Sequence, residues 1–180
     1  TIDVFPAGAG TITMGGTPLT SYSYTEVLEA DLDYYFITTP NDIWNVFDHW
    51  EINNHVLSPD EFNTNVVLHL MEDDTLVAVY NVIDHRLITV VVDPPYAGTV
   101  NYAGSYSTYT ENTSDMETGV AFPFLASPAE YWNFKGWEGL ASVPTPNSTD
   151  RNVSFTFTAT DTVWAHFEKE PFTMRTAIFF

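Results

Sequence analysis

Strict alternation of apolar and polar residues marks two pairs of segments in this chain. In the first half the alternation runs over residues 66–70 and 76–80, and in the second half over 153–157 and 163–167. The apolar positions are Val66, Leu68, Leu70, Leu76, Ala78, Tyr80, Val153, Phe155, Phe157, Val163, Ala165 and Phe167. A period of two residues is typical of strands with one buried face. We therefore expect four strands, and we expect each pair to form a hairpin that supplies one wall of a core.

Helical periodicity is weak by comparison. Residues 24–32 carry Val27, Leu28 and Leu32 at roughly helical spacing, but the corresponding residues 112–120 include Gly119. A pattern that fails in one of two matching segments favours strand or turn in both. The predicted fold class is all-β, β-rich and possibly β-grasp-like with at most a short helix.

Three landmarks occur twice along the chain, in the same order. Residues 9–12 (Ala-Gly-Thr-Ile) match residues 97–100 (Ala-Gly-Thr-Val), at an offset of 98 − 10 = 88. Residues 47–51 match 134–138 around a shared Trp-Glu, at an offset of 137 − 50 = 87, and residues 74–80 match 161–167 at the same offset. A period of this kind indicates a duplicated structural unit. The sequence thus predicts two tandem small β domains of the same fold.

The landmarks also predict boundaries. Residues 1–84 form repeat domain 1, residues 85–170 form repeat domain 2, and residues 171–180 begin a following element or a C-terminal strand. Residues 80–90 contain neither Gly nor Pro. Flexible linkers are rich in Gly, Ser or Pro, so we expect a short and fairly stiff join between the domains.

Two local features need an explanation within strands. Gly10 and Gly98 are expected in tight turns, because a residue without Cβ tolerates positive φ. Phe47 and Trp50 are three residues apart, so strict alternation would place them on opposite faces of a strand. Either the sheet is covered on both sides at that point or a β-bulge shifts the register.

The charge of the chain narrows its partners. It has 24 Asp and Glu against 5 Lys and Arg, a formal net charge of −19, and 14 of the acids lie in residues 1–86. Phosphate backbones and anionic membranes repel such a surface, so we expect no nucleic-acid partner. No apolar run reaches the roughly 20 residues that span a bilayer, so no membrane insertion is expected. The acids form either a solvated surface that resists association or carboxylates gathered for cations.

These features together resemble the divergent internalin-type B-repeat, a bacterial surface module found in tandem arrays. The resemblance lies in the opening run at residues 92–100, the aromatic segment that ends in Gly136-Trp137, and the closing Asp-Thr strand at 161–167. The first copy departs from the pattern, with His49 before Trp50 and Ile52 after Glu51. The resemblance implies two copies of a β-grasp-like or sandwich-like unit that serves as spacer or adhesive module. It carries over no catalytic residues.

No catalytic motif is present in the sequence. A nucleophile elbow, a P-loop, a dinucleotide-binding glycine pattern and a zinc-protease motif are all absent, and there is no cysteine. His49 and His55 lie near acids, but an i, i+6 pair is about 20 Å apart along an extended strand. We therefore predict no enzyme activity, no catalytic residues, no cofactor-binding residues and no metal ligands. Ca²⁺ at the acidic turns stays open as an alternative, since oxygen ligands can converge there.

Aromatic residues that differ between the copies are the candidates for ligand contact. Trp132 and Trp164 have Asn45 and Val77 as counterparts in the first copy. Matched residues explain folding, whereas unmatched exposed aromatics could stack on sugar rings. Packing or plain surface exposure is the competing interpretation of Trp132 and Trp164.

Two functions from different classes follow. The first is a non-enzymatic repeat segment of an exported bacterial cell-surface protein, extracellular, acting as stalk or spacer in an adhesin or filament-like protein. The second is an adhesive module that binds glycans or Ca²⁺ through exposed aromatics or acidic turns. The expected partners are neighbouring repeats of a longer chain, and surface glycans or other proteins in the second case.

Overall fold

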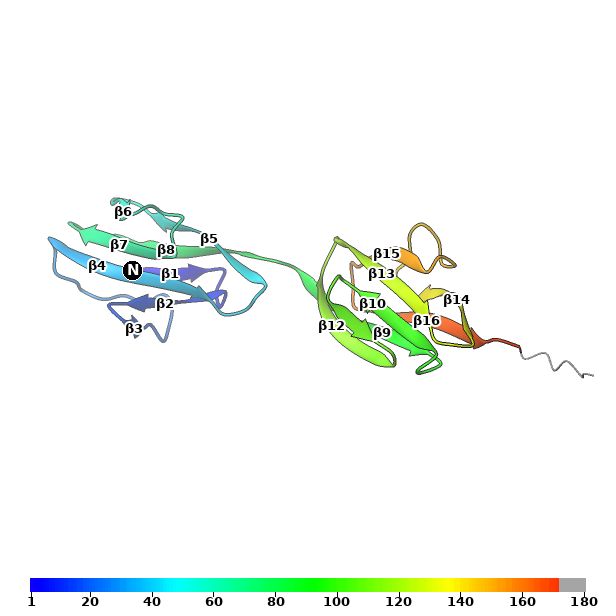
Figure 1. Ribbon diagram of the computed structural model, residues 1–180. Coiled ribbons are helices and arrows are strands. Elements are labelled where there is room, and N and C mark those ends of the chain that lie inside the picture. Colours follow the sequence, from blue (N-terminus) through cyan, green and yellow to red (C-terminus); the bar gives the residue numbers. More distant parts are fainter. Residues whose placement is uncertain (172–180) are drawn as a thin grey trace, which may run out of the picture. The chain divides into compact units, whose positions relative to one another are not determined.

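The computed structural model describes residues 1–171, which fall in two compact units, Thr1–Ile83 and a second that starts at Asp84. All regular elements of residues 1–171 are strands, so the all-β prediction is confirmed (Figure 1). Of the two forms that the resemblance implies, a sandwich is the one observed, since a β-grasp needs a helix. Within the described residues there is accordingly no helix long and apolar enough to cross a membrane.

The first unit consists of two sheets. Its strands are β1 (Ile2–Phe5), β2 (Gly10–Met14), β3 (Thr17–Pro18), β4 (Leu32–Pro40), β5 (Asn45–Ile52), β6 (Leu57–Ser58), β7 (Asn65–Leu70) and β8 (Leu76–Val82). One sheet has the order β1-β8-β5 and the other the order β3-β2-β4-β7-β6. The buried side chains of both sheets form one hydrophobic cluster, which makes the unit a β-sandwich.

The second unit has the same number of strands, but with one strand more in the first of its sheets and one fewer in the other. Its strands are β9 (His85–Asp93), β10 (Gly98–Tyr102), β11 (Tyr106–Thr108), β12 (Glu111–Glu117), β13 (Ala121–Pro128), β14 (Trp132–Gly139), β15 (Asn152–Thr156) and β16 (Asp161–Lys169). The sheet orders are β12-β9-β16-β14 and β11-β10-β13-β15. Its core is a separate cluster of buried residues.

The pairings of the first and last strands correspond in the two units. In the first unit β1 pairs in parallel with β8, and β5 pairs antiparallel with β8. In the second unit β9 pairs in parallel with β16, and β14 pairs antiparallel with β16. The first and last strand of each unit are therefore hydrogen-bonded parallel neighbours, which sets a single topology for both units.

The alternating positions predicted to face inward are buried, except Leu70, which is half-buried against the core. Leu76, Ala78 and Tyr80 of β8 are at most 3% exposed, and Val163 and Ala165 of β16 are fully buried. The hairpins predicted from the same positions are wrong. The strand β7 pairs with β4 and β6 in one sheet, while β8 lies in the other, and β15 and β16 are separated in the same way. Alternation fixes which face of a strand is buried, but two strands with buried faces can pack across the core as well as pair side by side.

The β-bulge is confirmed in both units. The register of β5 against β8 shifts between Phe47 and His49, and that of β14 against β16 shifts between Phe134 and Gly136. The extra residue returns Trp50 to the buried face, where it is 1% exposed and its ring lies 5.8 Å from that of Phe47. Each core tryptophan donates its indole N–H to a backbone carbonyl, Trp50 to Asn63 at 2.9 Å and Trp137 to Asp150 at 2.8 Å.

The turn expected at Gly10 and Gly98 is wrong, because both residues lie within strands and do not have positive φ. Their missing Cβ makes room for an aromatic ring of the other sheet. A Cβ at Gly98 would lie 2.6 Å from Cζ of Phe167, and one at Gly10 would overlap the ring of Tyr80. These glycines therefore allow close packing between the two sheets rather than a change of chain direction.

The second unit begins at Asp84, directly after Ile83 of the first unit. Ile83 donates its backbone N–H to Trp44 within the first unit, and Asp84 accepts from Thr118 within the second. Ile83 and Asp84 are thus each hydrogen-bonded within their own unit. The strand predicted for residues 171–180 lies outside the described residues, apart from Pro171.

Candidate functional site

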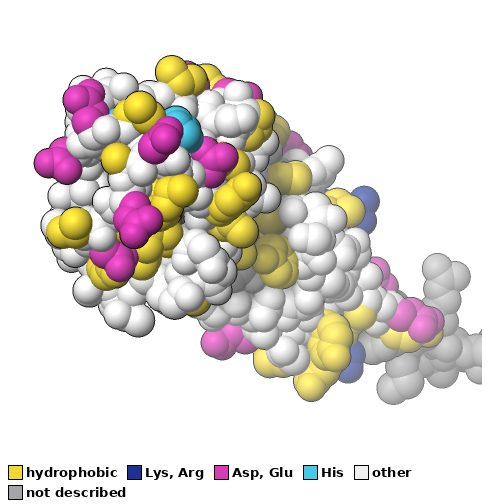
Figure 2. Space-filling view, turned by 90° about the vertical axis from the view of Figure 1, so that its left-hand side faces the viewer, with side chains coloured by type: hydrophobic (Ala, Val, Ile, Leu, Met, Phe, Trp, Pro, Cys, Tyr) yellow, Lys and Arg dark blue, Asp and Glu magenta, His cyan; other side chains and the backbone are white. Residues whose placement is uncertain are grey.

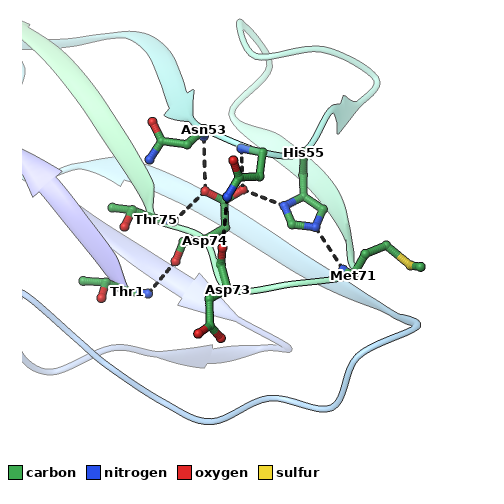
Figure 3. Close-up of polar contacts among 8 residues, drawn as sticks. Thr1, Asn53, His55, Met71, Asp73, Asp74 and Thr75 are labelled. Carbon is green, nitrogen blue, oxygen red and sulfur yellow. Dashed lines mark hydrogen bonds and ion pairs between the residues drawn. The ribbon is translucent and has the colours of Figure 1, made fainter.

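The most elaborate polar arrangement surrounds Asp74, in the loop that leads into β8 (Figure 3). One carboxylate oxygen accepts the backbone N–H of Thr75 at 2.7 Å and of Asn53 at 3.2 Å. The other accepts the backbone N–H of Asn54 at 3.0 Å and faces Nδ1 of His55 at 2.6 Å. A single side chain thereby ties the start of β8 to the loop that follows β5.

His55 is held in one tautomer by its two partners. The backbone N–H of Met71 donates to Nε2 at 2.9 Å, so the ring proton lies on Nδ1 and is donated to Asp74. Both side chains are buried, with 7% of His55 and 3% of Asp74 exposed. Burial alone would raise the pKa of the Asp74 carboxyl, but the hydrogen bonds from His55, Asn54, Thr75 and Asn53 outweigh it and lower the pKa.

The second unit has the same turn around Asp161. This carboxylate accepts the backbone N–H of Thr162 at 2.7 Å, of Ala141 at 3.0 Å and of Ser142 at 2.7 Å, and the residue is 2% exposed. In both units the Asp-Thr pair thus lies at the start of the last strand and is hydrogen-bonded to a neighbouring loop. Because their oxygens already accept several internal hydrogen bonds, Asp74 and Asp161 act as structural connectors between a strand and a loop.

Three further histidines, His49, His69 and His166, each lie between two carboxylates. Nδ1 of His69 lies 2.8 Å from Oδ1 of Asp33, and Nε2 lies 3.4 Å from Oδ1 of Asp31. His166 lies 2.9 Å from Asp93 and 3.1 Å from Glu138, and His49 lies 2.8 Å from Asp48 and 3.7 Å from Glu51. Hydrogen bonding to Asp33 is the main cause that raises the pKa of His69. Over residues 1–171, no three or more His, Asp or Glu side chains converge in a way that could hold a metal ion.

The structure does not bring Trp132 and Trp164 together. Trp132 is paired with Lys169 near one end of the β14/β16 ladder, and Trp164 is paired with Glu138 near the other. Trp132 is half-buried against the core cluster, which accounts for it by packing. Trp164 is also half-buried and alternates with the inward residues Val163 and Ala165, so it lies on the outer face of the sheet.

A more exposed aromatic pair lies elsewhere in the second unit. Tyr96 is 68% exposed and Tyr109 is 58% exposed, their ring centroids are 5.6 Å apart, and the rings are inclined by 30°. The backbone N–H of Tyr96 donates to the carbonyl of Tyr109 at 2.8 Å, which holds the two segments together. The sequence analysis missed this pair, although the comparison of copies could have found it. At the offset of 88, Gly8 and Ser21 stand in their place.

One family of known proteins matches the chain. The family model of the divergent InlB B-repeat domain matches residues 88–171. The match begins within β9 and ends just after β16. No curated protein matches the chain. The matched residues include the opening strand, Gly98, Trp137 and the Asp161 turn, the same features that build the second sandwich. The second unit of this chain therefore belongs to the divergent InlB B-repeat family, a family of bacterial surface repeat modules.

Proposed function

We propose that the chain is a non-enzymatic repeat segment of an exported bacterial cell-surface protein, where it acts as a stalk or spacer. The first unit is then a diverged second copy of the B-repeat. Its support is the matching strand order, bulge, tryptophan and Asp-Thr turn of the two units. The acidic excess adds to the proposal, because like charges keep neighbouring surfaces from associating.

One observation carries this proposal furthest. In each unit the entering and leaving strands are parallel neighbours, β1 with β8 and β9 with β16. The chain enters the first strand at one end of the ladder and leaves the last strand at the other end. A pull on the chain therefore shears the two strands along each other. All hydrogen bonds of the ladder are then loaded at once, instead of one after another. A spacer that carries tension between a cell and a surface needs this geometry.

Single-molecule force spectroscopy tests the proposal. The chain has no cysteine, so introduced cysteines give unique attachment points. Attachment at Asp84 and Glu170 loads the second unit through the parallel β9/β16 ladder. Attachment at Glu130 and Glu170 loads the antiparallel β14/β16 ladder from one end, where Glu170 donates to Tyr131, and opens it bond by bond. We expect a severalfold higher unfolding force in the first geometry.

The comparison is internally controlled, because the same unit with the same free energy of unfolding is pulled in two directions. Equal unfolding forces in the two geometries would contradict a tension-bearing role. Turnover of a polysaccharide by the purified chain would overturn the non-enzymatic part of the proposal.

A second candidate function is glycan contact by the second unit. The observation in its favour is the exposed Tyr96–Tyr109 pair, since exposed tyrosine rings present apolar faces to sugar rings. Binding to a glycan array that is lost on Tyr96→Ala and kept on Tyr131→Ala, another exposed tyrosine, would favour it. For the Ca²⁺ alternative, millimolar Ca²⁺ should raise the melting temperature, because a ligand that selects the native state stabilises it.

A further inference from the structure

Two exposed tyrosine rings meet on the surface of the second sandwich. Tyr96 lies in the loop between β9 and β10, and Tyr109 lies in the turn between β11 and β12. Their ring centroids are 5.6 Å apart, and 68% of Tyr96 and 58% of Tyr109 are exposed. The backbone N–H of Tyr96 donates to the carbonyl of Tyr109 at 2.8 Å. The two backbone segments are therefore held together while both rings stay accessible to solvent.

The backbone at Tyr96 has a conformation that glycine adopts more readily. Its φ is +66°, in the left-handed region that a Cβ disfavours. At the offset of 88 the first copy has Gly8, with a φ of +84°. Because the ring of Tyr96 is largely exposed, burial in the core does not offset this strain. Core packing thus gives no reason for a tyrosine here, whereas the contact with Tyr109 does.

Two neighbouring phenols are the substrate of one defined oxidation. A one-electron oxidant removes an electron and the phenolic proton from each tyrosine, which leaves two phenoxyl radicals. The radicals couple by forming a carbon–carbon bond between ring positions next to the hydroxyls. The hydrogens on these two carbons then move to the oxygens, which restores both phenols. In total the pair loses two electrons and two protons, and these reduce one molecule of hydrogen peroxide to two molecules of water.

The geometry favours coupling within this pair over coupling between chains. The rings must turn until two ring carbons meet, and exposed side chains change rotamer within picoseconds to nanoseconds. The hydrogen bond between the two segments keeps the second ring close, whereas a radical on another chain has to arrive by diffusion. The net charge of −19 also makes two copies of the chain repel each other.

A second tyrosine pair in the same unit is as close but is not accessible. The ring centroids of Tyr102 and Tyr106 are 5.4 Å apart, and the rings are inclined by 21°. Tyr102 is 1% exposed, stacks on Phe124, and accepts a hydrogen bond at its hydroxyl from Asn112 at 2.6 Å. A ring packed in this way cannot turn its edge toward its neighbour, and an oxidant does not reach it. This pair therefore serves as an internal control.

We propose that Tyr96 and Tyr109 are a modification site, at which a peroxide-driven one-electron oxidation joins the two rings through a dityrosine bond. The bond ties the loop after β9 to the turn before β12. The chain has no cysteine, so no disulfide can close a loop in it, and the tyrosine bond supplies this kind of closure. The inference goes beyond the spacer proposal and does not depend on it, since the bond forms whether or not the chain bears tension.

The test exposes the full chain, at low concentration, to hydrogen peroxide and a haem peroxidase. We expect dityrosine fluorescence in the monomer fraction. The tryptic peptide 87–135 should be lighter by two hydrogen atoms, with fragment ions that place the link between residues 96 and 109. Tyr96→Phe and Tyr109→Phe should each lower this fluorescence about tenfold or more, because phenylalanine has no phenol to oxidise and the proximate partner is lost. Tyr106→Phe and Tyr131→Phe, which remove other exposed phenols, should leave it unchanged.

Three outcomes would overturn the assignment. The first is monomer dityrosine that survives Tyr96→Phe or maps to Tyr102 and Tyr106. The second is a link that forms only between chains. The third comes from repeating the reaction in urea, where the tyrosines closest in sequence should couple instead. A preference for Tyr96 and Tyr109 that persists in urea would mean that the folded geometry does not direct the reaction.

Force spectroscopy gives an independent measurement on the linked chain. Residues 96 and 109 are 109 − 96 = 13 positions apart, and the bond keeps this segment closed when the unit is unfolded by pulling at Asp84 and Glu170. The stretched unit should be shorter by about 40 Å, at roughly 3.3–3.6 Å per residue. An unchanged length would contradict the link. This length does not depend on the unfolding force, so failure here is distinguishable from failure of the spacer proposal. Tyr96→Phe also separates the link from glycan contact, because a phenylalanine ring still stacks on a sugar.

Discussion

The two sandwiches share a pairing scheme but differ in how one end of the core is closed. In the second unit Ile88 and Met116 lie buried beneath the β9/β12 ladder, whereas in the first unit the corresponding region is a cavity of about 540 Å³ with acidic residues along its rim. Figure 2 looks onto this end of the first unit, where acidic side chains stand among apolar ones. The central features are duplicated around Trp50 and Trp137. The difference teaches that the fold is determined by the parallel ladder, the bulged strand and the Asp-Thr turn.

The comparison is sharpened most strongly by removing each core tryptophan. Trp50→Ala and Trp137→Ala should each destabilise their own unit by about 3–5 kcal/mol, because a large buried side chain and its indole hydrogen bond are lost. Chemical denaturation of the full chain, followed by hydrogen exchange in each unit, measures the loss. A loss in the first unit much smaller than in the second would break the equivalence of the cores.

The connecting aspartates give the next largest effect. Asp161→Ala should cost the second unit about 1–3 kcal/mol, since three part-buried backbone N–H groups lose their acceptor. Asp74→Ala should cost the first unit a similar amount and additionally free His55. Urea denaturation of both variants checks this, with Asp150→Ala, an exposed acid of the same loop region, as the control.

The stability of the first unit at low pH should differ between the parent chain and Asp74→Asn. The pKa of Asp74 is lowered in the folded unit, so its contribution to stability is complete above the ordinary value of 3.8 and is lost as the pH falls through the lowered value. Asp74→Asn should therefore flatten the decline in stability of the first unit below pH 3.8. Thermal melts at decreasing pH measure this. The same fall in melting temperature in Asp74→Asn and in the parent chain would contradict the role of the hydrogen bonds to Asp74.

Substitution of a packing glycine should cost less stability than loss of a core tryptophan. A second substitution that shortens the facing side chain should recover part of the loss. Gly98→Ala places a Cβ against Phe167 and should destabilise the second unit by about 1–3 kcal/mol. Phe167→Leu should recover part of this loss in the double variant. Gly104→Ala is the matched control, because Gly104 has a φ of +74° but open space around it, so only backbone strain is tested. Additive losses in the double variant, from urea denaturation, would exclude the steric explanation.

The smallest expected effect concerns His69, which only the first unit has. Its pKa is raised above 6.5, chiefly by hydrogen bonding to Asp33, so its contribution to stability is complete below pH 6.5 and is lost as the pH rises through the raised value. NMR titration should find the pKa of His69 lowered in Asp33→Asn. Because the pair is exposed, added salt should reduce the shift, and a shift that is insensitive to salt would contradict this interpretation.

Much of the fold could be read from the sequence, and the parts that could not have a common cause. Alternation located the buried faces at Val66, Ala78 and Val163, and the spacing of Phe47 and Trp50 pointed to a bulge. Which strand pairs with which was mispredicted, because alternation describes one strand and carries no information on its neighbour. The role of Gly98 was mispredicted for the same reason, since its partner Phe167 is 69 residues away in the other sheet.

The candidate sites were less predictable than the fold. Comparing the copies directed attention to unmatched aromatics, and of these Trp132 packs against the core. Whether an aromatic side chain is exposed depends on its position along the strand and on the face of the sheet that it occupies. The identity of the residue alone determines neither. The comparison of copies could have singled out Tyr96 and Tyr109 as unmatched aromatics, but only the folded chain shows that their rings lie together. The cavity of the first unit is lined by segments distant in sequence, so the sequence does not reveal it.

The parallel pairing of the first and last strands also sets the order of folding. Ile2 pairs with Leu76 and Val90 pairs with Val163, so the sheet that contains these strands can form only after nearly the whole unit has been synthesised. Closing such a long loop costs chain entropy before the contacts of the ladder compensate for it, and pairings of this kind slow folding. In each unit this sheet therefore stays incomplete until the last strand emerges, whereas the other sheet does not contain that strand.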